Sequence, residues 1–252
     1  MPETLVQIGP PRGFGETMRK DAWWVAPLVT FSVLTGFIVY TTWAAFQGDH
    51  YEFGPYLSPL YSPLLPRPSW WPSWLFFSPA LLILPFPAGF RFTCYYYRGA
   101  YYKSHWADPP SCAVGEPRKS YLGERSFPLI LQNVHRWFMY AAIVFIFILG
   151  WDAIVSYRFA DGFGIGLGSL VLTVNVILLG GYTFGCHSLR HLVGGVFDQL
   201  SRRPVRAKVY DGVSCLNRRH MLWAWVSLVW VAFTDVYVRL CSMGIWHDLR
   251  IL

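Results

Sequence analysis

The stretch AAIVFIFILG, residues 141–150, contains no polar side chain and decides the class of fold. The low charge continues on both sides of it, so that an apolar segment extends from about Leu129 to Tyr157. Because roughly 20 apolar residues form a helix long enough to cross the hydrocarbon core of a bilayer, this segment predicts a transmembrane helix. The composition agrees, since 54% of the residues are hydrophobic and only 14% are charged.

Five such charge-poor segments occur along the chain. The second contains four prolines, which predict kinks, and the fourth contains several glycines, which allow another helix to approach closely. The sequence therefore predicts an all-α integral membrane protein in which residues 1–252 form a single membrane-anchor domain, a five-helix transmembrane bundle. The predicted spans are residues 23–46, 70–90, 129–157, 164–189 and 221–241.

The basic residues predict the orientation of this bundle. With the N-terminus on the cytoplasmic side, the segment before the first span contributes three basic residues, and residues 91–136 and 190–219 contribute seven each to the same face. Only four basic residues remain for the outer face, and cytoplasmic loops carry the excess of Lys and Arg. We therefore expect a multi-pass protein of the cytoplasmic (inner) membrane with its N-terminus inside.

Thirteen Trp and fifteen Tyr suit the aromatic belts of a membrane protein. The predicted partner is thus the lipid bilayer and not nucleic acid, despite the net charge of +7.

Cysteine and histidine gather at the inner ends of the predicted spans. Thiolate and imidazole are ligands that suit iron, zinc, copper or iron–sulfur centres. A single histidine near a membrane interface is usually only hydrated or hydrogen-bonded, so the prediction of a metal site depends on several of them sharing one depth. The candidate metal ligands are Cys94, Cys112, Cys186, His135, His187, His191 and His220.

Two acidic residues lie within the predicted spans. Asp152 and Asp235 are costly in lipid unless they are paired, and we expect an interhelical partner such as Arg239 or Arg158 in preference to a proton pathway.

Four blocks of sequence resemble the membrane-anchor subunit (the cytochrome b-like C subunit) of succinate dehydrogenase or fumarate reductase, of the actinobacterial type. They occur in order and at matching span ends, and together they cover well over half of the chain. The blocks are FRFTCYYYRGAYYKSHWADPPSCAVGEP at 90–117, RSFPLILQNVHRWFMY at 125–140, YTFGCHSLRHLVGG at 182–195 and LNRRHMLWAWVSLVWVAFTDVYVRL at 216–240.

The resemblance implies a place in the respiratory chain and the tricarboxylic acid cycle. An anchor of this kind joins a flavoprotein subunit and an iron–sulfur subunit, and electrons pass from succinate to a quinone, either menaquinone or ubiquinone. It implies a subunit of succinate dehydrogenase (quinone) with no catalytic dicarboxylate site and no catalytic residue of its own. The basic segments 98–125 and 202–219 could dock an acidic iron–sulfur partner, or they could simply follow the orientation bias of cytoplasmic loops.

The resemblance also implies a cofactor. Anchors with two b haems need histidines near both membrane faces, but the first two predicted spans contain none. The actinobacterial type instead implies a Rieske-type [2Fe–2S] cluster with two Cys and two His ligands, so that four of the seven candidates should ligate. Cys94 with Cys186 is the natural thiolate pair and Cys112 the competitor, while all four histidines remain open.

Two alternatives to this cluster remain. One is a single b haem held by two of the inner histidines. The other is a proton-coupled transporter, which is disfavoured because the polar groups collect at one face and form no ladder through the bilayer.

A quinone site should lie near the cluster and needs an apolar slot with a few polar groups. The same residues could equally form an ordinary aromatic and basic belt at the membrane interface. The quinone-binding candidates are Arg98, Arg136, Trp137, Arg219 and Trp223.

Overall fold

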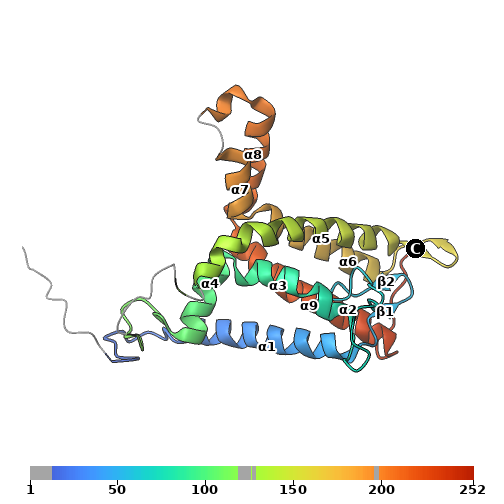
Figure 1. The fold of residues 1–252 in the computed structure, drawn as a ribbon, viewed down its shortest axis with the longest axis horizontal. Coiled ribbons are helices and arrows are strands. Elements are labelled where there is room, and N and C mark those ends of the chain that lie inside the picture. Colours follow the sequence, from blue (N-terminus) through green and yellow to red (C-terminus); the bar gives the residue numbers. More distant parts are fainter. Residues whose placement is uncertain (1–12, 119–125, 127–128, 196–198) are drawn as a thin grey trace, which may run out of the picture. The chain divides into compact units, whose positions relative to one another are not determined.

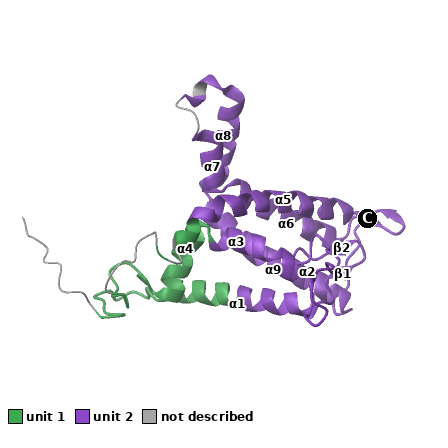
Figure 2. Cartoon of the chain, in the orientation of Figure 1, with its two compact units in different colours: residues 1–36, 93–132 green, residues 37–92, 133–252 purple. Residues whose placement is uncertain are grey.

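The structure, a computed structural model, describes residues 13–118, 126, 129–195 and 199–252 and is mostly helical (Figure 1). The chain divides into two compact units (Figure 2). Unit 1 consists of residues 1–36 and 93–132, and unit 2 consists of residues 37–92 and 133–252. The single domain of residues 1–252 that the sequence predicts stays a prediction.

Four helices in the described part of the chain are long and apolar enough to cross a membrane. In the third predicted span, a 3-10 segment, η2 (Leu129–Val134), precedes the α-helix. Four of the five predicted spans are thus confirmed as long apolar helices. These are α1 (Val25–Gln47), α5 (His135–Val155), α6 (Leu167–Phe184) and α9 (His220–Ser242).

The prediction that residues 70–90 form one helix was wrong. Residues 70–78 are not helical, and the chain forms two short helices, α2 (Pro79–Ile83) and α3 (Pro85–Phe92). Each begins with a proline, which lacks an N–H group and is tolerated only in the first turn of a helix. The prolines that we expected to kink a long helix instead set where two short ones start.

The fourth predicted span was too long at its end. Helix α6 stops at Phe184, Cys186 adopts an extended conformation, and a separate helix, α7 (His187–Gly194), follows. The segment η3 (Leu200–Arg202) and helix α8 (Pro204–Asn217) then lead to α9.

Unit 2 is a bundle in which α3 packs on α5, α5 on α6 and α6 on α9. Glycines permit these close approaches. A Cβ atom at Gly89 would lie 2.3 Å from the ring of Phe138, and one at Gly181 would lie 2.6 Å from the ring of Trp223. As expected from the sequence, small residues therefore let large rings of the neighbouring helix lie directly on the backbone.

The two ends of this bundle differ in chemistry. We call the end that contains His135, Cys186 and His220 the cysteine–histidine end, and the opposite end, which contains Asp235 and Asp248, the carboxylate end. Two antiparallel hairpins lie in the connections of unit 2, one of β1 (Glu52–Phe53) with β2 (Tyr56–Leu57) and one of β3 (Arg158–Phe159) with β4 (Gly162–Phe163).

At the carboxylate end, Asp248 joins three segments of the chain. Its carboxylate accepts hydrogen bonds from the hydroxyls of Tyr56 and Tyr237, each at 2.6 Å, and from the N–H of Gly168 at 2.9 Å. The last of these bonds satisfies a donor in the first turn of α6, where a negative charge is also favoured by the helix dipole. Burial, and then the hydrogen bond to Asp248, raise the pKa of Tyr56.

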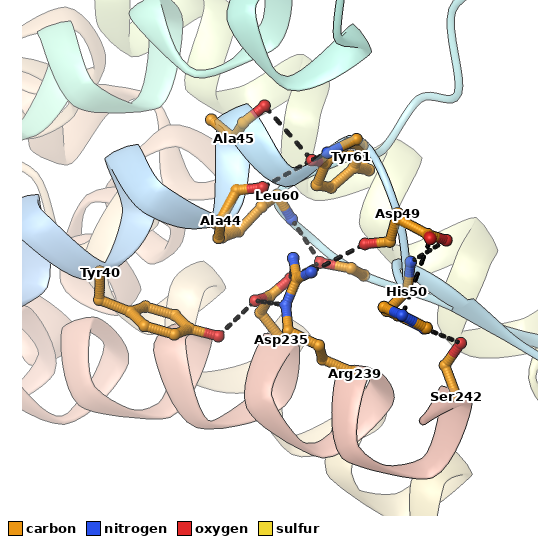
Figure 3. A network of polar contacts seen from close by, with 12 residues as sticks. Tyr40, Ala44, Ala45, Asp49, His50, Leu60, Tyr61, Asp235, Arg239 and Ser242 are labelled. Carbon is orange, nitrogen blue, oxygen red and sulfur yellow. Dashed lines mark hydrogen bonds and ion pairs between the residues drawn. The ribbon is translucent and has the colours of Figure 1, made fainter. Parts of the chain in front are cut away.

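Asp235 is fully buried and is the centre of a second polar network at this end (Figure 3). Its carboxylate accepts hydrogen bonds from the hydroxyls of Tyr40 and Ser58 and forms an ion pair with Arg239, whose Nε lies 3.2 Å away. Arg239 also donates to the carbonyl oxygen of Asp49 at 2.8 Å. The expected pairing with Arg239 is confirmed, but it lies within one helix and not between two.

For Asp152 the expected arginine partner was wrong. Its carboxylate accepts a hydrogen bond from the hydroxyl of Ser62 instead. A neutral donor from a neighbouring segment thus bonds this carboxylate, where we had expected an arginine such as Arg239 or Arg158.

Unit 1 combines the first part of α1 with α4 (Tyr95–Tyr101) and a π-helical turn, η1 (Tyr102–Trp106). The Nε2 atom of His105 lies 3.3 Å from Thr35 Oγ1, and its ring packs on Phe31. The guanidinium of Arg19 donates to Ser111 Oγ at 2.7 Å and to the carbonyl oxygen of Cys112 at 2.9 Å. The loop that carries Cys112 is therefore fastened to the N-terminal segment.

Candidate functional site

The centre of the cysteine–histidine end is a contact between His135 and Cys186. His135 is the first residue of α5 and Cys186 is the N-cap of α7, and only 8% and 1% of their surfaces are exposed. The Nε2 atom of His135 lies 3.2 Å from the sulfur of Cys186. Residues far apart in the sequence thus bring one imidazole and one thiol together inside the protein.

The turn between α6 and α7 holds Cys186 in this position. A Cβ atom at Gly185 would lie 2.7 Å from the carbonyl oxygen of Gly181, so the turn has no space for a side chain there. The amide of Asn217, at the end of α8, donates to the carbonyl oxygen of Gly185 at 2.8 Å. The chain therefore bends immediately before the cysteine and is held in the bend by a second helix.

Aromatic rings connect His135 to a second histidine of this end, His220, which is half-buried. Phe90 stacks on His135 with 4.9 Å between ring centroids, and Tyr182 stacks on His220 at the same distance. Phe90 and Tyr182 meet edge to face at 5.2 Å. The four rings come from α3, α5, α6 and α9, so the stack is the point at which these four helices meet.

Arg91 places a positive charge beside this stack. Its guanidinium donates to Ser227 Oγ at 2.9 Å and to the carbonyl oxygen of Ala224 at 3.2 Å, and its carbon lies 4.6 Å from the centre of the Tyr182 ring. Arg91, Phe90 and Tyr182 were not among the residues predicted from the sequence. A charged residue at the end of a predicted span was the one signal that could have pointed to Arg91.

His187 and His191 form a separate pair on α7. Their Nε2 atoms lie 3.1 Å apart, as the spacing of four residues on one helix face predicted, and both side chains are exposed. They line a cavity of about 330 Å³ together with Arg190 and Tyr210. Partial burial, and then His191 and Arg190, lower the pKa of His187.

In unit 1, Cys94 occupies a setting that matches that of Cys186. It is the N-cap of α4, it is 3% exposed, and its backbone angles of −65° and 130° are close to the −65° and 138° of Cys186. Cys112, by contrast, is exposed in a loop. Arg98, a quinone candidate, lies over the ring of Tyr95 at 4.1 Å.

The other quinone candidates fall into two groups. Trp223 lies against Gly181 within the bundle. Arg136, Trp137 and Arg219 are exposed, and 72% of the surface of Trp137 is accessible. Trp223 therefore packs against the helix that supplies Tyr182.

The predicted metal ligands meet in pairs. Among the residues that the structure describes, no three His, Cys, Asp or Glu side chains lie close enough together to hold a metal ion. The pairs are His135 with Cys186 and His187 with His191, while Cys94 and Cys112 belong to unit 1. The set of four ligands stays a prediction.

Comparison with known proteins points to one family. The family model described as "Actinobacterial succinate dehydrogenase subunit SdhC" matches residues 25–244. A chain of the solved structure "Mycobacterium smegmatis Sdh1 complex in the apo form" is similar, with a TM-score of 0.84, 45% sequence identity and an alignment that covers 94% of each chain. A search of curated proteins found no match.

Proposed function

Because the chain belongs to the actinobacterial succinate dehydrogenase subunits SdhC, we propose that it carries electrons from the iron–sulfur subunit of that complex to a quinone. It is a multi-pass membrane subunit of succinate dehydrogenase, which is respiratory complex II. The observation that carries the proposal is the buried contact between His135 and Cys186 within an aromatic stack at one end of the bundle.

We further propose that the chain crosses the membrane five times with its N-terminus in the cytoplasm. Ala80 of α2 packs in a cluster with Ala44 and Tyr61, near the end of α1, whereas Phe90 of α3 contacts His135. The two short helices thus lead from the carboxylate end to the cysteine–histidine end. At about 1.5 Å per residue they cover roughly 20 Å, and the preceding coil supplies the rest of the crossing. The positive-inside rule then assigns the cysteine–histidine end to the cytoplasmic side.

The candidate ligands have the chemistry that a Rieske-type [2Fe–2S] cluster requires, which is two thiolates and two imidazoles. Cys94 and Cys186 are both buried N-caps, and His135 and His220 each begin a helix. The partial positive charge of a helix N-terminus stabilises negative charge. These positions therefore suit a cluster that gains a negative charge when it is reduced.

We assign the thiolates to Cys94 and Cys186 and the first imidazole to His135. The second imidazole comes from His220, which lies in the stack, or from His187, which directly follows Cys186. When bound, such a cluster supplies a carrier of single electrons with a higher potential than an all-cysteine cluster. Histidines that do not ligate would still tune that potential through hydrogen bonds.

The quinone, in this proposal, binds next to Arg91. The guanidinium of Arg91 is held by Ser227 and Ala224 beside the ring of Tyr182, which belongs to the aromatic stack. A fixed positive charge in such surroundings stabilises the negative charge that develops on a quinone oxygen as electrons arrive. Trp223 contributes an apolar wall near the same helix.

Single replacements in the purified complex test the cofactor assignment. Replacing Cys186 by Ser, or His135, His220 or His187 by Ala, should remove or shift a rhombic EPR signal of low mean g value when the residue is a ligand. His247→Ala is the matched control, because His247 is exposed and is not among the candidate ligands, and this variant should retain the signal. Sharp reduced-minus-oxidised haem bands without that EPR signal would disprove the cluster and support the single b haem.

A further inference from the structure

Helix α8 carries an apolar stripe that is covered at one end of the helix and exposed at the other. Residues 205, 209, 213 and 216 share one face, since they are spaced by four, four and three positions. Val213 is buried, and Leu216 lies against the turn at Gly185. Val205 and Val209 continue the stripe to the tip of the hairpin, where they are 77% and 49% exposed.

The exposed part of the stripe forms a groove together with α7. Leu192 and Val193 of α7 line a cavity of about 600 Å³ with Val205, Val209 and neighbouring residues of α8. Arg206 donates to the carbonyl oxygens of Val193 at 2.7 Å and of Leu192 at 3.1 Å, and thereby satisfies the C-terminal end of α7. The two helices are thus fastened together at the tip, so the groove is a fixed feature of unit 2.

Positive charge surrounds this groove. Residues 199–219 contain one acidic residue, Asp211, and Lys208 and Arg206 flank the apolar stripe on its two sides. The basic residues of the segment are Arg202, Arg203, Arg206, Lys208, Arg218 and Arg219.

The direction in which α7 and α8 run indicates what covers the exposed apolar stripe of α8. Within unit 2, α7 and α8 run across the direction of α5, α6 and α9 at the cysteine–histidine end (Figure 1; unit 2 is purple in Figure 2). When the long helices cross the bilayer, a hairpin that runs across them extends along the membrane surface. Amphipathic helices with basic flanks and a narrow apolar stripe bind at such a surface.

We infer that the α7–α8 hairpin lies in the headgroup layer of the cytoplasmic leaflet and binds anionic phospholipids. Val205 and Val209 enter the boundary of the acyl chains, and Arg202 and Lys208 bind the phosphates. This inference requires the bundle to span a membrane with the cysteine–histidine end inside, but it depends neither on the cluster nor on the quinone. The competing occupant is a soluble subunit of the complex.

Fluorophores on opposite sides of α8 test the inference. The variants Val205→Cys and Asp211→Cys are labelled with an environment-sensitive dye in the intact complex, and the signal of the equally labelled parent complex, with its native exposed cysteines, is subtracted. The complexes are placed in nanodiscs of phosphatidylcholine alone or with phosphatidylglycerol. Quenching is measured with iodide in the water and with nitroxide-labelled lipid.

The nitroxide lipid should quench the label at position 205 far more than that at position 211, and iodide should show the opposite order. Phosphatidylglycerol should strengthen the lipid quenching at position 205. Adding Arg202→Gln and Lys208→Gln should weaken this preference for phosphatidylglycerol, by up to about fivefold for each charge.

Three results would overturn the inference. Equal access of iodide to both positions would show that the stripe is in water, and lipid quenching without any dependence on phosphatidylglycerol would remove the role of the anionic headgroups. A label at position 205 that is shielded from both quenchers, in detergent as well as in nanodiscs, would assign the stripe to a soluble subunit. EPR spectra and quinone reduction measured on the same samples report on the proposed function separately.

Discussion

The two ends of unit 2 bury polar side chains in different ways. At the carboxylate end, Asp235 is surrounded by Arg239, Tyr40 and Ser58, and Asp248 by two tyrosine hydroxyls and a backbone N–H. At the cysteine–histidine end, a thiol contacts an imidazole and an arginine donates to a hydroxyl and a carbonyl oxygen.

Under the proposed function, this difference separates an end that stabilises the fold from an end that takes part in electron transfer. Charges at the carboxylate end are stabilised by an ion pair and by hydrogen bonds from the same chain, which fasten α1, α9 and the connecting segments to one another. The cysteine–histidine end instead collects groups that can bind iron or stabilise a reduced quinone. We therefore expect substitutions at the first end to change stability, and substitutions at the second to change electron transfer.

The largest effect is expected for Cys186→Ser. Loss of one thiolate ligand should abolish the [2Fe–2S] EPR signal and the reduction of quinone by succinate, while oxidation of succinate with a soluble artificial acceptor continues in the assembled complex. Cys241→Ser is the matched control, because Cys241 is equally buried but lies on α9 near the carboxylate end. Retention of the signal in the Cys186 variant would remove this residue from the site.

Asp235→Ala should cause the next largest effect, on stability alone. Arg239 would keep a buried charge without its carboxylate, which costs about 3–5 kcal/mol. Thermal unfolding of the purified complex measures the loss. The double variant Asp235→Leu/Arg239→Met should recover most of it, because both charges are then removed. Loss of the EPR signal in folded Asp235→Ala complex at low temperature would contradict the separation of the two ends.

Arg91→Gln should raise the KM for quinone and lower kcat. The loss of a hydrogen-bonded charge corresponds to about 1.5–3 kcal/mol, or roughly a 10- to 150-fold decrease in kcat/KM. Arg91→Lys should recover part of this activity because the charge is retained. Steady-state kinetics with a soluble quinone analogue provides the measurement, and an unchanged kcat/KM in both variants would exclude Arg91 from the quinone site.

The smallest effects concern glycines. Gly168→Ala should destabilise the protein by about 1–3 kcal/mol, since its Cβ atom would lie 2.5 Å from the ring of Tyr56, which Asp248 holds in place. Gly212→Ala, on α8, meets nothing within 4 Å and should instead stabilise the helix by about 0.5–1 kcal/mol. Thermal unfolding compares the two variants. If the two variants changed the stability equally, the side chains around Gly168 would have to move at little cost to make space for the added methyl group.

Much of the fold could be predicted because a helix that crosses a lipid bilayer needs a long run of apolar residues, which is easy to recognise in a sequence. In lipid, a run such as AAIVFIFILG forms a helix because its backbone N–H and C=O groups must then be hydrogen-bonded to one another. The segment with Pro79 and Pro85 could not be predicted in the same way, because hydropathy averages over a window and does not register where a proline starts a new helix. For the same reason the fourth predicted span ended at residue 189, beyond the bend at Gly185 where α6 ends.

The candidate site was predicted in its residue types but not in its contacts. Sequence placed His135 and Cys186 at one membrane depth, and the structure brings them to 3.2 Å. Arg91 and Tyr182 were missed because neither is a soft metal ligand, and their importance comes from stacking and hydrogen bonds made with residues of other helices. The partner of Asp152 was missed for a related reason, since Ser62 lies ninety positions away.

The sequence by itself showed that this protein lies in a lipid bilayer, and it predicted the number of long apolar helices to within one. It also showed which kinds of potential ligand gather at the ends of the spans. These follow from local composition, because transfer to lipid depends on each segment alone. Only the tertiary structure decided which thiol meets which imidazole, which charge neutralises which, and which way the α7–α8 hairpin runs. Those depend on how α3, α5, α6 and α9 pack, and packing is set by contacts between residues distant in the sequence.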